Sequence, residues 1–300
     1  MSRAEAVHTV VAALVAIEEH LGAPPKWVAT TEAQAAFLRD VYAGCRSEVK
    51  RIPEIESCGS TSAGELNAFA ARRGLAVSFG PFGSDDAGAV SVLDLLVTWT
   101  VPGHPTIVIT RDQHQFPAVR LPSSQVEFRR AAFHPAPIAN IGTLSGDEVY
   151  ITPLASSDSD LVALARRLTD DSAPGGDFAG VVFPMVDLIE NRNLDVAAGL
   201  MTRAADTRPV QIRTAEQQLS LKMNEHGARA EAVTTMRLLL GVEPPPPPDF
   251  VINEPFLVWF QRSGLSAPLF VAHVTPEAWR NPKDLASRLS KPGRSRAGRD

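Results

Sequence analysis

A stretch with two successive alternating patterns, Val210–Thr235, constrains the fold of this chain more than any other feature. From Val210 to Asn224, apolar side chains recur at nearly every second position, which is the period of a strand that buries one face. Glu216–Gln218 interrupt the pattern midway, and Gly227 then lets the backbone leave a sheet. The sequence therefore predicts a broad sheet with Val210–Asn224 near its middle.

Small side chains occupy every second position after that glycine. Residues of one parity are small, and residues of the other parity are mostly polar; the small ones are Ala228, Ala230, Ala232 and Thr234. In an extended strand the small parity would face the core and add almost no volume to it, so this segment could be inserted between two existing strands. Alanine and glutamate also favour helices, so an amphipathic helix is the alternative.

A proline run and two apolar segments follow. Pro244–Pro248 predicts an extended spacer; an ordinary linker and a ligand for a proline-binding domain are the alternatives. Beyond it, Phe250–Phe260 and Pro268–Val274 are apolar runs on either side of a short polar turn. They predict a hairpin that is buried on both faces.

Several segments resemble the serpin family of serine protease inhibitors, and they follow one another along the chain in the order of the family's motifs. Phe250–Phe260 is similar to the serpin signature through Asn253, Pro255 and Phe256, and it departs at Glu254, where the family usually has a basic or small polar residue. Asn224–Gly227 resembles the serpin hinge. Phe183–Leu188 with Asn193 and Leu194 resembles the strand and turn before the last large helix. The resemblance is specific from Gly176 to Val274 and extends back to Phe37, with residues 1–36 unplaced.

The resemblance implies an α+β fold with a large mixed central β-sheet, smaller sheets, flanking helices and an exposed reactive loop. Helices and strands that mix without regular βαβ alternation agree with this class. We expect a single domain over residues 1–280, with an N-terminal part that is shorter than in other serpins, either because the true N-terminus is missing or because this is a reduced, divergent member.

The resemblance also implies a mechanism. A serine-type endopeptidase attacks the reactive loop and becomes trapped as an acyl-enzyme when the loop inserts into the main sheet, a known case of strand addition. Hinge residues would be Glu225, Gly227, Ala228, Ala230, Ala232 and Thr234. The scissile-bond candidates are Leu240, Gly241 and Val242. Leu240 favours a chymotrypsin-like or subtilisin-like protease, and Arg237 is the alternative specificity residue, for a trypsin-like one.

Some positions depart from inhibitory serpins. Arg229 and Glu231 replace what are usually an acid and an alanine, although both lie on the outward parity. Gln217 stands where the family commonly has a histidine under the sheet opening, and Val97 replaces an asparagine. A non-inhibitory serpin-like binding protein is therefore the alternative function.

Composition argues against other functions. A net charge of −5 shows no nucleic-acid footprint, and two cysteines, Cys45 and Cys58, cannot form a disulfide framework. The seven histidines lack a His-x-x-x-His spacing, so we expect no metal site, no cofactor and no enzymatic activity. A hydrolase is a remote alternative, because no Gly-x-Ser-x-Gly motif is present.

The two ends of the sequence bear on location and partners. Residues 1–22 lack a signal-peptide cleavage site, and no segment is predicted to span a membrane. We expect a cytoplasmic monomer, with an extracellular location as the alternative that the resemblance implies. Residues 281–300 are basic and poor in apolar residues, which predicts a disordered tail; contact with an anionic surface or nucleic acid is the alternative.

Overall fold

A computed structural model describes residues 1–22, 26–75, 77–95, 98–156, 160–206, 208–225 and 247–282. The strand predicted at Val210–Asn224 is β13 (Pro209–Met223). Buried and exposed residues alternate along it, and Glu216–Gln218 do not break it. It lies in a five-stranded sheet with a neighbour on each side, in the order β11 (Val186–Asn193), β13, β3 (Asp86–Leu95), β2 (Ile55–Ser60), with β12 (Met201–Arg203) pairing its first residues.

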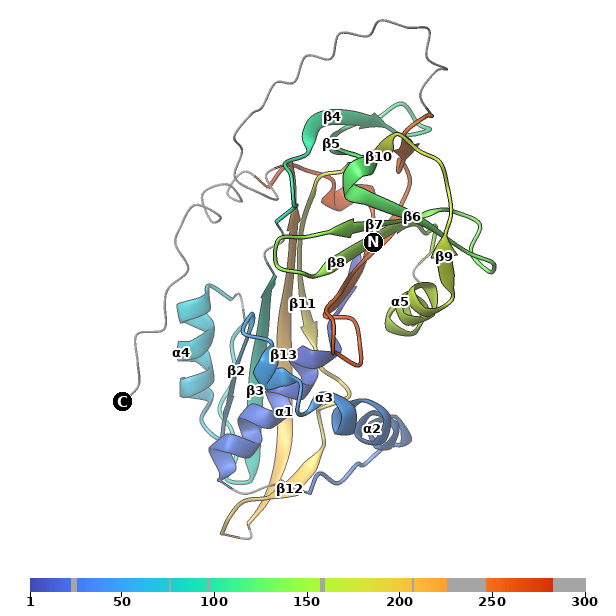
Figure 1. Cartoon of the computed structure of the whole chain (residues 1–300). Coiled ribbons are helices and arrows are strands. Elements are labelled where there is room, and N and C mark those ends of the chain that lie inside the picture. Colours follow the sequence, from blue (N-terminus) through green and yellow to red (C-terminus); the bar gives the residue numbers. More distant parts are fainter. Residues whose placement is uncertain are drawn as a thin grey trace, which may run out of the picture.

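Two helices cover opposite faces of this sheet. Helix α1 (Val7–Leu21) packs Leu14 and Ile17 against Ala87 and Ala89 of β3, which defines the α1 face. Helix α4 (Ala63–Arg73) packs Leu66 and Phe69 against Val90, which defines the α4 face. Figure 1 shows α4 beside β2 and β3, with α1 crossing the lower part of the same sheet. Both helices end as predicted, at Gly22 and Gly74, whose φ angles of 70° and 67° are left-handed.

The sheet with the most strands is a different one. Seven antiparallel strands follow the order β1 (Arg3–Glu5), β16 (Phe270–Val274), β15 (Phe256–Gln261), β8 (Glu148–Pro153), β7 (Ile138–Gly142), β6 (Val126–Ala131), β9 (Ser172–Pro174). β15 and β16 form the predicted hairpin, and every residue of both strands except Gln261 is buried. Helix α5 (Leu161–Asp170) packs on this sheet through Leu161 and Leu168, and Asp160 caps it. The five-stranded sheet is therefore mixed, as expected, but it is not the widest.

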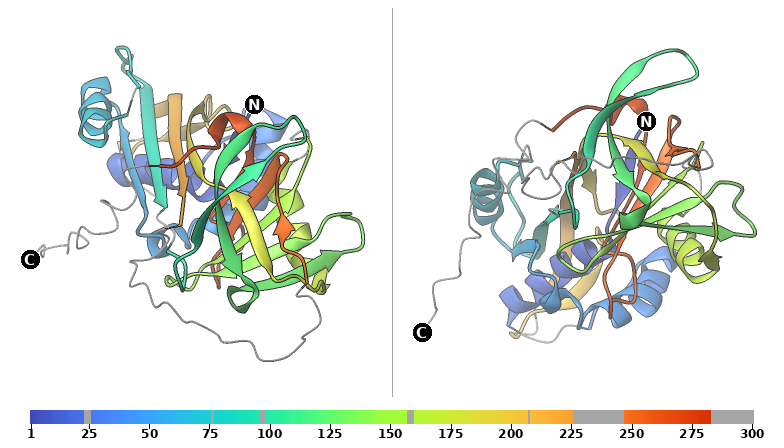
Figure 2. Two further views of the ribbon diagram at one scale, coloured as in Figure 1. Left: turned by 90° about the horizontal axis from the view of Figure 1, so that it is seen from above. Right: turned by 45° about the horizontal axis from the view of Figure 1, so that its top comes forward.

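A third sheet has four strands, in the order β14 (Phe250–Val251), β10 (Gly180–Pro184), β5 (Gln115–Pro122), β4 (His104–Ile109). The apolar run at Thr106–Thr110 predicts a buried strand from the sequence, and the structure shows that this burial is wrong. β4 is an edge strand, and Ile107 and Ile109 are 55% and 43% exposed. Figure 2 (right) shows the β4–β5 hairpin reaching beyond the rest of the sheets.

Local assignments differ elsewhere from the sequence prediction. The sequence of Glu32–Tyr42 predicts one helix, and the structure divides this segment into α2 (Glu32–Phe37) and a π-helical turn η1 (Leu38–Tyr42), followed by α3 (Ala43–Cys45). The sequence of Asp170–Asp177 predicts a loop, but this segment contains β9, which pairs with β6. Residues 1–36, unplaced by the resemblance, form β1, α1 and the start of α2, and three short 3-10 turns lie at Val49–Arg51 (η2), Ser123–Gln125 (η3) and Pro276–Ala278 (η4). Within the described part of the chain, no helix is long and apolar enough to span a bilayer.

Candidate functional site: the seam between β3 and β13

The five-stranded sheet contains one parallel pair, β3 with β13, which we call the seam. The other pairs of this sheet are antiparallel. The seam runs from the Gln211–Asp86 pair to the Leu221–Leu95 pair, with a register shift between Ile212 and Thr214. A strand placed between two parallel neighbours can run antiparallel to both. The seam is therefore the place where a segment that turns back after β13 would meet two equivalent partners.

Contacts between backbone and side chains close the upper end of the seam. Past the end of β3, the buried Trp99 donates its Nε1–H to the Asn224 carbonyl at 2.9 Å and packs edge-on against Phe183 at 5.9 Å. The Gly103 N–H donates to the Glu225 carbonyl at 3.1 Å. These contacts hold the last residues after β13, so the predicted hinge residue Glu225 is fixed to the segment that follows β3.

The middle of the seam is lined by small and polar side chains on its α1 face. Ala89 lies in register with Ala215, and Ser91 with Gln217. Gln217 is 3% exposed, and its Oε1 accepts a hydrogen bond at 2.6 Å from the hydroxyl of Thr9 in α1. The buried Ser91 hydroxyl has no hydrogen-bond partner among the described residues. The glutamine that departs from the family pattern therefore ties β13 to the helix beneath it.

The α4 face of the seam is open above α4. A hollow of about 670 Å³ lies over it, lined by polar groups that include Glu56, Asp94, Gln218, Ser220 and Lys222. Polar side chains on this face mean that the two strands can separate here without first exposing an apolar layer.

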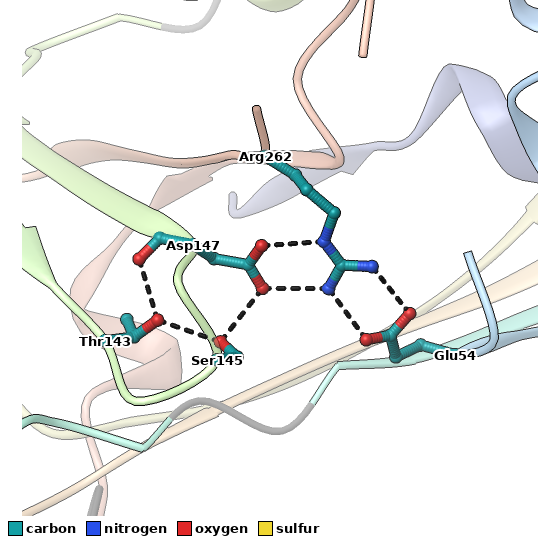
Figure 3. A network of polar contacts seen from close by, with 5 residues as sticks. All are labelled: Glu54, Thr143, Ser145, Asp147 and Arg262. Atoms are coloured by element: carbon teal, nitrogen blue, oxygen red, sulfur yellow. Dashed lines mark hydrogen bonds and ion pairs between the residues drawn. The ribbon is translucent and has the colours of Figure 1, made fainter. Parts of the chain in front are cut away.

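An ion-pair network lies next to the upper end of the seam (Figure 3). Arg262, just past β15, donates to Asp147 at 2.7 and 2.8 Å and to Glu54 at 3.0 and 2.7 Å. The hydrogen bonds that Arg262 donates to Asp147 and Glu54 raise its pKa above the ordinary value. Thr143 donates to the Asp147 carbonyl at 2.7 Å and pairs with Trp99 in an isolated bridge. The network thus joins the seven-stranded sheet to the start of β2 and to the Trp99 segment.

The residues of the predicted signature connect the sheets. Asn253 Nδ2 donates to the Ile109 carbonyl at 3.1 Å, and the Pro255 carbonyl accepts from the Leu154 N–H at 2.8 Å. Phe256 opens β15 and is fully buried. Just before β14, Asp249 accepts two hydrogen bonds from Arg120 of β5, at 2.8 and 2.9 Å. The signature therefore positions the chain where it passes from the four-stranded to the seven-stranded sheet.

Most of the predicted loop lies outside the described residues. These positions are Gly227, Ala228, Ala230, Ala232, Thr234, Arg237, Leu240, Gly241 and Val242, together with Val97 of the expected central strand. Glu225 precedes the loop directly, and the described chain resumes at Pro247. Sequence reasoning did not find Thr9, Trp99 or Arg262, because each acts on a partner far away in the chain and no spacing marks it.

Comparisons with known proteins agree with this geometry. Residues 185–276 match the family model described as Serpin (serine protease inhibitor). Structures with a similar fold include the mouse protein-Z dependent protease inhibitor (12% identity, 91% of this chain and 90% of that chain, TM-score 0.58). Others are SRPN18 from Anopheles gambiae (11%, 94% and 93%, 0.58) and a serpin from Schistosoma mansoni (12%, 91% and 95%, 0.59). A search of curated protein sequences gives no significant match.

The matched region contains β11, β13 and the signature, and the similar structures extend the likeness over most of the chain. Residues 185–276 thus match the serpin family model, and the likeness of the rest of the chain to these structures is one of fold.

Proposed function

We propose that this protein inhibits serine-type endopeptidases as a suicide substrate. A protease attacks the loop that follows Glu225, and the cut loop inserts between β3 and β13 before the acyl-enzyme is hydrolysed. The parallel seam carries this proposal, because it ends where the loop begins and offers two strand edges to one antiparallel segment.

The lengths of the segments are compatible with insertion. Gly227–Gly241 spans 15 residues, as does β13. Insertion replaces one ladder of ten paired positions by two, a net gain of about ten backbone hydrogen bonds. At about 1 kcal/mol net each, this gain of roughly 10 kcal/mol exceeds the cost of moving the parts of a protease active site by ~1 Å.

The side chains are also compatible. The α1 face of the seam carries Ala89, Ala215 and Ser91, so an inserted strand meets small neighbours there. Ala228, Ala230, Ala232 and Thr234 would supply the small parity toward α1. Leu240 then favours a chymotrypsin-like or subtilisin-like target.

A specific observation favours the non-inhibitory alternative. The Thr9–Gln217 hydrogen bond and the Trp99–Asn224 hydrogen bond both hold β13 in its present position. If these contacts keep the seam shut, the loop is cut as an ordinary substrate, and the fold serves to bind a partner.

Incubation with chymotrypsin and subtilisin tests the proposal. A covalent complex that survives denaturing electrophoresis is expected. Replacing Ala232 by Arg, on the inward parity, should convert the protein into a substrate, whereas Glu231→Arg, on the outward parity, should leave the complex intact. If both proteases give only cleaved product and no complex, the non-inhibitory alternative is favoured.

Thermal unfolding after the loop is cut provides a second measurement. Insertion predicts a large rise in the melting temperature of the cut protein. The same melting temperature before and after cleavage would rule insertion out.

A further inference from the structure

Beyond the seam, a second constellation of side chains lies buried beside α1. A ring nitrogen of His8, Cys45 Sγ and a Glu48 carboxylate oxygen all lie within 4.8 Å of one another, and all three residues are buried. They come from the first turn of α1, from α3 and from the segment just before η2. An imidazole, a thiol and a carboxylate converge here in one buried place, and each is a ligand type that Zn²⁺ binds.

A fourth oxygen completes the group. The Ser266 hydroxyl, on the turn between β15 and β16, lies 3.4 Å from Cys45 Sγ and 3.1 Å from Glu48 Oε2. The His8 Nε2 to Glu48 Oε2 distance is 2.9 Å, a little shorter than the separation of about 3.3 Å between two ligands that are each ~2.0 Å from a tetrahedral zinc ion. Half an ångström of side-chain adjustment would therefore admit the ion.

The imidazole and the carboxylate are in protonation states that can bind a cation. Burial lowers the pKa of His8, which leaves the imidazole neutral at neutral pH. Burial alone raises the pKa of Glu48, but its bonds to His8 and Ser266 outweigh burial and leave the pKa below its ordinary value. Burial raises the pKa of Cys45, so the thiol stays protonated until a metal displaces the proton.

The second nitrogen of His8 points to the outer layer of the site. Nδ1 is buried and has no hydrogen-bond partner of good geometry among the described residues, although the Pro268 carbonyl acts on the ring as a backbone acceptor. Zinc at Nε2 would require the ring proton to lie on Nδ1. Zinc-bound histidines regularly donate this second N–H to a backbone carbonyl, the role that Pro268 would take.

We infer that His8, Cys45 and Glu48, with Ser266 or a water as the fourth ligand, bind one Zn²⁺ ion. Binding replaces the His8–Glu48 hydrogen bond by two metal bonds and releases one proton from Cys45. The ion fastens α1 to the α3 end and to the β15–β16 turn. Because the next residue, Thr9, holds Gln217, the site would also steady the helix beneath the seam.

Titration of the full chain, after removal of metal with a chelator, tests the site. Zn²⁺ should bind at one equivalent and raise the melting temperature. Co²⁺ should produce the thiolate-to-cobalt absorption and the visible bands of a four-coordinate ion. Cys45→Ser should abolish the thiolate band and weaken Zn²⁺ binding by about 100-fold or more. Losing a ligand should weaken binding at least as much as losing a group that only hydrogen-bonds to a ligand.

Cys58→Ser is the matched control, because Cys58 is the other free cysteine and lies in β2, away from the cluster. This variant should keep both the cobalt spectrum and the zinc stoichiometry. Glu48→Gln gives a second test if Cys45→Ser folds poorly, and circular dichroism reports the fold of each variant. Wild-type protein that binds no zinc, or a thiolate band that follows Cys58 instead of Cys45, would overturn the inference. None of these readouts depends on protease inhibition.

Discussion

Replacing Arg262 by methionine probes the junction between the two larger sheets. The side chain of Asp147 is 5% exposed, while those of Arg262 and Glu54 are 20% and 26% exposed. Methionine keeps much of the aliphatic volume but removes both ion pairs. Asp147 then retains only the Ser145 hydroxyl, at 3.1 Å, among the side-chain partners of the network.

The expected loss follows from the burial of Asp147. Breaking a buried ion pair from one side costs about 3–5 kcal/mol, chiefly because the remaining charge stays buried. Glu54 and Arg262 keep some contact with water, so we expect a value at the lower end, about 3 kcal/mol in the free energy of unfolding. Changing Asp147 to Asn in the same chain removes the unpaired charge. The double variant should therefore be more stable than Arg262→Met alone by about 1–2 kcal/mol.

Urea unfolding followed by tryptophan fluorescence measures these differences. Arg39→Met is the matched control, because Arg39 makes an equally short bidentate pair with Asp40 but is 64% exposed. That variant should change stability by less than about 0.5 kcal/mol. If Arg262→Met loses no more than the Arg39 variant, or if Asp147→Asn adds to the damage, the buried charge is not what makes Arg262 important.

Two further predictions concern the seam, and a third concerns His134 at the seven-stranded sheet. Thr9→Val leaves the buried Gln217 amide without its partner and should lower the free energy of unfolding by about 1–3 kcal/mol, as measured by chemical denaturation. Thr9→Ser keeps the hydroxyl and should lower it by less. Equal losses in the two variants would show that the hydrogen bond is unimportant. Trp99→Phe removes the donor to the Asn224 carbonyl and should lower the free energy of unfolding by about 1–2 kcal/mol. It should also speed hydrogen exchange of the Gly103 amide. An unchanged exchange rate would show that Trp99 does not hold the upper end of the seam shut. Burial lowers the pKa of His134, so the unfolded chain binds the proton more readily than the folded chain does. The stability present above pH ~6.5 should therefore fall as the pH drops below that value. His134→Gln should make the melting temperature depend less on pH in this range, and an unchanged pH dependence would assign the effect to other groups.

Local sequence patterns predicted the helices and strands in which buried positions recur at a regular spacing. β13 is recognisable because one of its faces is buried at nearly every second residue, and α1 and α4 because glycine ends each of them. β4 shows what such patterns miss. Its residues Ile107–Ile109 form an apolar run like that of a buried strand, but β4 lies at the edge of its sheet, and its neighbours decide its exposure. The sequence shows where apolar and polar residues alternate, but it does not show which other helices and strands cover them.

The candidate site was predictable only in part for a related reason. The hinge and signature are contiguous segments, so a family resemblance could identify them. The contacts that close the seam join residues far apart: Thr9 and Gln217 are 208 positions apart, as are Arg262 and Glu54, and Trp99 and Asn224 are 125 apart. No spacing within the sequence encodes such pairs, and the parallel register of β3 and β13 appears only once the sheet is assembled.

The anchoring of the segment after the loop has a consequence for the cut protein. β14 pairs with β10, β15 lies between β8 and β16, and the Arg120–Asp249 ion pair fixes the point where the described chain resumes. A polypeptide severed after Leu240 would thus yield a C-terminal fragment whose strands remain woven into two sheets. The two fragments should elute together in native gel filtration and separate only in denaturant. Cleavage would therefore be detected by mass spectrometry or denaturing electrophoresis, but not by the elution volume of the native protein.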